Sequence, residues 1–186
     1  MPKCPMLSTN NNMRNKFANI DKVDIKKGIN VFFSEKNITE KIFIKPNAGS
    51  PIEYITIAST GNATTFGTLS PTYVGYGGAA CSSSTRAIWA GGSSGNIVNN
   101  ISYVTIASTG NSTDFGDLTE TKYNIAGCTN STTAYFFGGQ GSSGAVQNID
   151  KITIASTGNA TDTGVDVKTT SSTYGMAASG SHGGIS

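Results

Sequence analysis

The feature that most limits the fold is an eight-residue phrase, Ile-Thr-Ile-Ala-Ser-Thr-Gly-Asn or a close variant. It occupies residues 55–62, 104–111 and 152–159. β-Branched residues followed by a polar Gly-Asn corner are typical of a short strand and its turn. The repeat lengths are 49 and 48 residues, counted between Gly61, Gly110 and Gly158. Four-stranded units such as propeller blades have periods of this size, so we expect a tandem β array from about residue 50 onward.

The composition favours one repeat domain with a polar, weakly charged surface. The chain has 186 residues, of which 13% are charged and 23 are glycine. This length allows a single domain with a real core. The formal charge of +2 is too small to indicate nucleic acid as a partner. The N-terminal residues form no apolar run of the length that a signal peptide or membrane helix needs, so we expect no membrane insertion.

The repeat divides the chain into segments. Residues 1–28 are rich in Asn and Lys and are expected to form an extended leader. Residues 29–186 are expected to form the β-repeat domain, with a degenerate unit and three repeats at 29–51, 52–100, 101–149 and 150–186. Short strands separated by Gly, Ser and Asn turns predict antiparallel sheets with almost no helix. The third repeat stops in mid-unit, so we expect the strand at 29–33 to complete it and to remove an open edge.

Two units carry a double glycine after an apolar strand, Gly91-Gly92 and Gly138-Gly139. Together with the Thr-Ile-Ala-Ser-Thr-Gly-Asn phrase and the Phe-Gly-Asp-Leu at 115–118, this pattern resembles the kelch repeat. The form is similar to kelch-type repeats in virion proteins of tailed phages and other large viruses. The resemblance covers about residues 52–186. It implies a kelch-like β-propeller, and a virion protein acting as a capsid-decoration, fibre or tail-associated component.

About three units are fewer than the roughly four to eight blades of a closed propeller. The propeller is therefore expected to be partial or completed by oligomerisation, or the chain to be a fragment of a longer protein. A three-sheet β-prism with a lectin-like function is the alternative. Exposed strand edges favour pairing with other virion proteins or with copies of the chain itself. The expected assembly edge consists of Phe32, Phe33, Ile42 and Ile44.

The sequence offers little chemistry. His182 is the single histidine, and the acidic residues show no metal-ligand spacing, so we expect no enzyme, no cofactor and no metal site. The alternative function is a carbohydrate-binding module that recognises host-surface glycans through exposed aromatic rings. The candidate binding residues are Tyr73, Trp89, Tyr123 and Arg86. For Trp89 a core position is the competing interpretation.

Cysteine provides a further expectation. The chain has three cysteines, and Cys81 and Cys128 hold equivalent positions in successive repeats. Equivalent positions of neighbouring blades are normally too far apart for a disulfide. We therefore expect two small core residues rather than a covalent bond.

Overall fold

The structure of the chain, a computed structural model, describes residues 30–33, 41–45, 51–57, 60–69, 76–93, 95–168 and 177. Every regular element in these ranges is a β-strand. The predicted antiparallel all-β class is therefore confirmed, and the described ranges contain no helix that could cross a membrane. The expected leader, residues 1–28, lies outside them.

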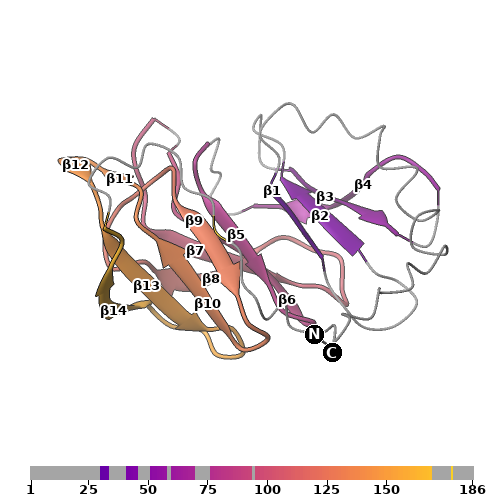
Figure 1. Cartoon of the computed structure of the whole chain (residues 1–186). Helices are drawn as coiled ribbons and strands as arrows, with labels where there is room; N and C mark the ends of the chain where they lie inside the picture. The colour runs from indigo at the N-terminus through magenta and orange to yellow at the C-terminus, as the bar shows by residue number, and fades with distance from the viewer. Residues whose placement is uncertain are drawn as a thin grey trace, which may run out of the picture.

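Three four-stranded antiparallel sheets make up the fold (Figure 1). The first consists of β1 (Asn30–Phe33), β2 (Lys41–Lys45), β3 (Pro51–Thr56) and β4 (Thr64–Thr68). The second consists of β5 (Ala79–Ser82), β6 (Arg86–Ala90), β7 (Asn100–Thr105) and β8 (Thr113–Asp117). The third consists of β9 (Ala126–Thr129), β10 (Thr133–Phe137), β13 (Asn148–Thr153) and β14 (Thr161–Asp166). A separate ribbon pairs β11 (Gln140–Gly141) with β12 (Gly144–Ala145).

The boundaries of the sequence repeats do not coincide with the boundaries of the sheets. A repeat begins with the third strand of one sheet and ends after the second strand of the next, so residues 52–100 cover β3 to β6 almost from end to end. The Gly-Asn corner consequently links the third and fourth strands of every sheet. The double glycine follows the second strand of the second and third sheets. The degenerate unit 29–51 supplies β1 and β2, the first half of the first sheet.

The expectation that residues 29–33 complete the third repeat is wrong. β1 pairs with β2, with Val31 opposite Ile44 and Phe33 opposite Ile42, and so belongs to the first sheet. The third sheet has β9 and β14 at its edges and takes all four strands from within 126–166. A short connection joins β1 to β2, and closing a short loop costs less entropy than closing one that reaches the far end of the chain.

The sheets pack face to face around two apolar clusters. Because side chains alternate along a strand, Ile88 of β6 faces the third sheet and Trp89 faces the first. The cluster between the first two sheets comprises Phe43, Ile52, Phe66, Leu69, Ala87, Trp89, Val104 and Ile106. The cluster between the last two includes Cys81, Ile88, Ile101, Phe115, Leu118, Ile125, Phe136, Ile152 and Ile154.

The first strands of the sheets lie next to one another. β5 contacts β1 on one side and β9 on the other, so the sheets form a row in chain order (Figure 1). Each described sheet is open, with an outer edge strand. A closed propeller stays a prediction.

Candidate assembly interface

The Gly-Asn corner of the repeated phrase joins neighbouring sheets. The corner between β7 and β8 reaches β4, the outer strand of the first sheet. Gly110 N–H donates to the Phe66 carbonyl and Ser112 N–H to the Thr68 carbonyl, both at 2.9 Å. Asn111 Oδ1 accepts from the Thr68 N–H at 3.0 Å and from its hydroxyl at 2.9 Å. Thr68 thus binds the corner through both of its main-chain groups.

A β-bulge in β4 makes this contact possible. The pairing of β3 with β4 shifts between Ile52 and Glu53, which leaves Phe66 as an extra residue outside the ladder. The extra residue of a bulge is unpaired with the partner strand, so the Phe66 carbonyl is available to the corner. The approach is so close that a Cβ on Gly67 would collide with the main chain of Gly110.

The same contact joins the second sheet to the third. Gly158 N–H donates to the Phe115 carbonyl and Ala160 N–H to the Asp117 carbonyl, both at 2.7 Å. Asn159 Oδ1 accepts from the Asp117 N–H at 3.0 Å. β8 carries its bulge at the same place as β4. The three main-chain hydrogen-bonding groups therefore recur position for position.

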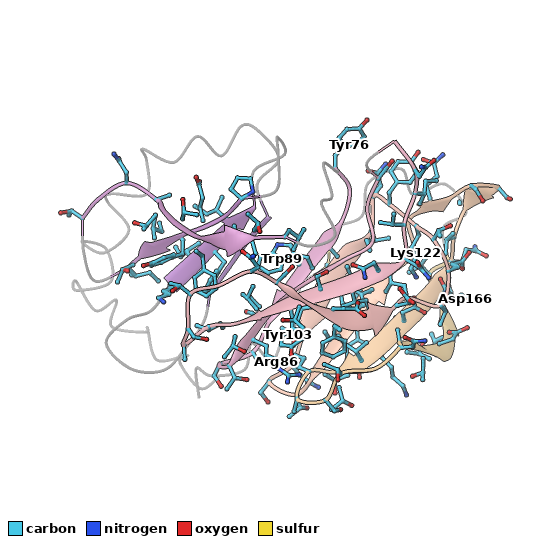
Figure 2. All side chains as sticks on the ribbon, turned by 180° about the vertical axis from the view of Figure 1, so that it is seen from behind. Tyr76, Arg86, Trp89, Tyr103, Lys122 and Asp166 are labelled. Carbon is cyan, nitrogen blue, oxygen red and sulfur yellow. The ribbon has the colours of Figure 1, made fainter. Side chains whose placement is uncertain are left out.

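In each of the first two sheets, a cationic side chain at the start of the second strand adds a contact with the next sheet. The Arg86 guanidinium lies 4.5 Å from the centre of the Tyr103 ring, and Nη1 donates to the Ile154 carbonyl of the third sheet at 2.8 Å (Figure 2). Lys41 holds the same place in the first sheet, with Nζ 3.4 Å from the Ile106 carbonyl. A cation on an aromatic ring is favourable, the more so when partly desolvated. Each of the first two sheets is thus tied to the next by a side chain as well.

A buried polar network fixes the loop that precedes β9. Asp150 accepts from the Thr119 hydroxyl at 2.6 Å and from its N–H at 3.2 Å. Lys122 donates to Asn148 Oδ1 at 2.9 Å, and the Lys122 carbonyl accepts from the Gly92 N–H at 2.9 Å. Buried polar groups are costly unless they are paired. The network therefore favours one position of this loop between the second and third sheets.

The first sheet presents a corner that no described residue meets. Ala63 of this corner is exposed. The residues that correspond to Ala63 in the two internal contacts, Ser112 and Ala160, are each only 8% exposed. Among the described residues, none therefore occupies this half of the contact at this end of the row.

β14 presents the other half. Asp166 holds the register position in β14 that Asp117 holds in β8. The next residue, Val167, donates its N–H to the Gln147 carbonyl, toward the ladder. Since main-chain groups alternate in direction along a strand, the Asp166 N–H and carbonyl point outward. Asp166 is exposed and lies at the flank away from the first sheet (Figure 2).

The outer strand of the third sheet is modified. β14 has 6 residues, whereas β4 and β8 have 5 each. Residues 163–165 all lie between the pairs formed by Asp162 and Asp166, so the bulge is wider by one residue. Val165 is 61% exposed, and its N–H donates to the Thr163 hydroxyl at 3.3 Å.

A hollow of about 390 Å³ lies at β10, β13 and the corner of the third sheet, and Phe115 of the second sheet also lines it. Its lining includes Phe115, Thr133, Tyr135, Lys151, Ser156, Thr157, Asn159 and Thr161. Thr133 and Lys151 hold the register positions of Arg86 and Tyr103. The third sheet therefore lacks the cation-on-ring pair, and the hollow is lined by hydroxyls, an amide, the side chain of Lys151 and two aromatic residues.

The described members of the predicted binding set serve the packing. Trp89 is 5% exposed and lies in the core between the first two sheets. Arg86 is engaged with Tyr103 and the third sheet, as above. Tyr123 is half-buried, and its hydroxyl donates to Gln140 Oε1 at 2.8 Å. Tyr73 lies outside the described residues.

The predicted assembly edge lies in the first sheet. Phe32 and Phe33 belong to β1, and their side chains lie outside the description. Ile42 and Ile44 are 2% and 4% exposed. They occupy the face of β2 opposite to Phe43, which belongs to the cluster shared with the second sheet.

The two described cysteines are free thiols on the neighbouring strands β5 and β9. The Cys81 thiol donates to the Cys128 carbonyl at 3.5 Å. Burial raises the pKa of both thiols, and for Cys81 the neighbouring Cys128 raises it further. Both are therefore protonated at neutral pH.

The inter-sheet role of the corner was not foreseen from the sequence. The signal that could have found it is the joint recurrence of Gly-Asn with Phe-Gly about five residues later in the first two copies. For Lys122 and Asp150 there is no such signal, because each appears in one repeat only. Within the described ranges no three His, Cys, Asp or Glu side chains gather as a metal site, and His182 lies outside them.

Comparison with known proteins assigns no family to this arrangement. A scan against protein-family models finds no match, and a search of the curated proteins finds no significant relative.

Proposed function

We propose that the chain is a virion structural protein, a capsid-decoration, fibre or tail-associated component, that acts by protein–protein packing and not by catalysis. The observation that carries this proposal is the repeated corner contact. Three equivalent hydrogen bonds, two between main-chain groups and one from a main-chain N–H to an Asn side chain, join each sheet to the next. The first sheet exposes a corner, and the outer strand of the third sheet offers two of the three groups that such a corner binds. An array built in this way can be continued by a partner at both ends.

The resemblance of the repeats to kelch-type units of virion proteins supports a location in the virion. A surface rich in Ser, Thr, Asn and Gly also suits permanent packing among neighbours. The test is protein analysis of purified particles. We expect the chain at a copy number that matches capsid or tail symmetry, and its absence from purified particles would contradict the proposal.

A second candidate function is carbohydrate binding, and the hollow on the third sheet favours it. The half-buried ring of Tyr135 and the hydroxyls and amide around it are groups that bind sugars. The residues differ from those expected from the sequence. A glycan array with wild-type protein and with Tyr135→Ala tests this candidate. Specific binding that the substitution removes would favour it, whereas binding by neither protein would count against it.

A further inference from the structure

We propose that the exposed corner Gly61-Asn62-Ala63 of one copy binds the outer edge of β14, at Asp166, in a second copy. This inference rests on the proposed packing function and deepens it, because it names the partner and the atoms. The contact is head-to-tail, since it joins different surfaces of the two copies.

The internal contacts show what the corner requires of its partner. Two of the three main-chain groups that it binds belong to one residue, Thr68 in the first sheet and Asp117 in the second. That residue donates its N–H to the side-chain oxygen of the corner Asn. Its carbonyl accepts from the N–H of the residue that follows the Asn. Any outward-facing residue in the same register position offers the same pair of groups, whatever its side chain.

Asp166 meets this requirement. Its register position equals that of Asp117, and its N–H and carbonyl point away from β13. In the second copy Asp166 N–H would donate to Asn62 Oδ1, and Ala63 N–H would donate to the Asp166 carbonyl. Ala63 would then be covered as Ala160 is in the third sheet, at 8% exposure.

The external contact should be weaker than the internal ones. β14 has the wider bulge, so the third hydrogen bond, from Gly61 N–H, has no carbonyl at an equivalent position. The cation is also missing, because Thr133 stands where Arg86 stands in the second sheet. With two hydrogen bonds, one of them to the Asn62 side chain, and no cation, we expect association that is reversible on dilution.

The test is sedimentation velocity of the full chain over a dilution series. We expect wild-type protein to show a mass that rises with concentration above the 19.2 kDa of one chain. Asn62→Ala combined with Ala63→Gln removes the acceptor and blocks the approach, so it should give a monomer. Thr65→Gln is the matched control, because the corresponding Asp114 stays exposed beside an occupied corner. It should associate like wild type.

The β14 half is tested by Asp166→Pro, which removes the outward N–H while keeping the edge strand, where proline is tolerated. Asp166→Ala keeps the N–H and is the control. We expect Asp166→Pro to be monomeric with a near-normal melting temperature, and Asp166→Ala to associate. Asp117→Pro, in contrast, should lower the melting temperature, because that N–H is used within the chain.

Mixing the two defective proteins distinguishes a head-to-tail contact from a symmetric one. Asn62→Ala/Ala63→Gln keeps an intact β14, and Asp166→Pro keeps an intact corner, so a mixture should form pairs although neither protein does so alone. A mixture that stays monomeric, or association that both sets of variants leave unchanged, would overturn the inference. Wild-type protein that is monomeric at every concentration would also overturn it. The proposed function would then still be decided by the copy number in particles.

Discussion

Lys122 and Asp150 form an ion pair in which both side chains are fully buried, with Nζ and Oδ2 3.1 Å apart. Lys122 comes from the loop before β9 and Asp150 from β13, so the pair ties that loop to the third sheet. Removing one partner of a buried pair leaves an uncompensated charge, which typically costs about 3 to 5 kcal/mol.

We therefore expect Asp150→Ala to lower the free energy of unfolding by about 3 to 5 kcal/mol, a large part of the stability of a typical domain. Urea denaturation followed by circular dichroism measures this change. Asp166→Ala is the control, because that carboxylate is exposed and its loss should change stability by about 0.5 kcal/mol or less. Equal changes in the free energy of unfolding for the two substitutions would show that the buried ion pair contributes no more to stability than an exposed carboxylate does.

The asparagines of the three corners should differ in their contribution to stability. Asn111 and Asn159 each accept a main-chain N–H of the preceding sheet, so replacing either by alanine should cost about 1 kcal/mol. This corresponds to a fall in melting temperature of about 2 to 4 °C for a domain of this size. Asn62→Ala is the matched control, and it should leave the melting temperature of the monomer unchanged. A loss of stability in Asn62→Ala as large as the others would mean that the corner stabilises its own turn instead.

The close approach at Gly67 predicts a strong effect of a single methyl group. A Cβ there would collide with the Gly110 main chain, so Gly67→Ala should destabilise the chain by about 1 to 3 kcal/mol, as overpacking does. Gly61→Ala adds the same group where no atom lies within 4 Å, and it should be neutral or slightly stabilising. Thermal unfolding of the two variants side by side checks this pair. Identical melting temperatures would show that the sheets separate easily enough to admit the Cβ.

Local pattern predicted the strands well, and it could not predict which strands belong to one sheet. The strand at 29–33 and the phrases at 55, 104 and 152 could be identified because alternation and turn residues are properties of neighbours in sequence. The contact between Thr68 and Asn111 spans 43 residues, and the local sequence of neither segment indicates that the other is its partner. The strand at 29–33 was assigned to the wrong sheet for the same reason. Its β character was local, while its partner depended on the cost of loop closure.

The inter-sheet contact could not be recognised from the sequence for a second reason, because most of its hydrogen-bonding groups belong to the main chain. Corner glycines and asparagines were interpreted as turn formers, which they are. Their second role depends on a bulge in another strand, where the Phe66 carbonyl leaves the ladder. In the sequence, the only sign of the extra residue in β14 is the absence of the phenylalanine that the other two copies have. That the bulge is wider could be recognised only from the strand register.

The buried thiol of Cys81 predicts a dependence of stability on pH. Burial and the neighbouring Cys128 raise its pKa above the ordinary value of 9.0, so above about pH 9 the thiol ionises in the unfolded chain but not in the folded one. The unfolded state then binds fewer protons, and stability falls as pH rises. Wild-type protein should lose stability by up to about 1.4 kcal/mol per pH unit more steeply than Cys81→Ala between pH 9 and 10.5. Urea denaturation at a series of pH values measures both slopes, and the variant cancels the contributions of lysine and tyrosine. Parallel slopes for the two proteins would mean that the Cys81 thiol reaches water in the folded chain, and that the packing of β5 against β9 is open there.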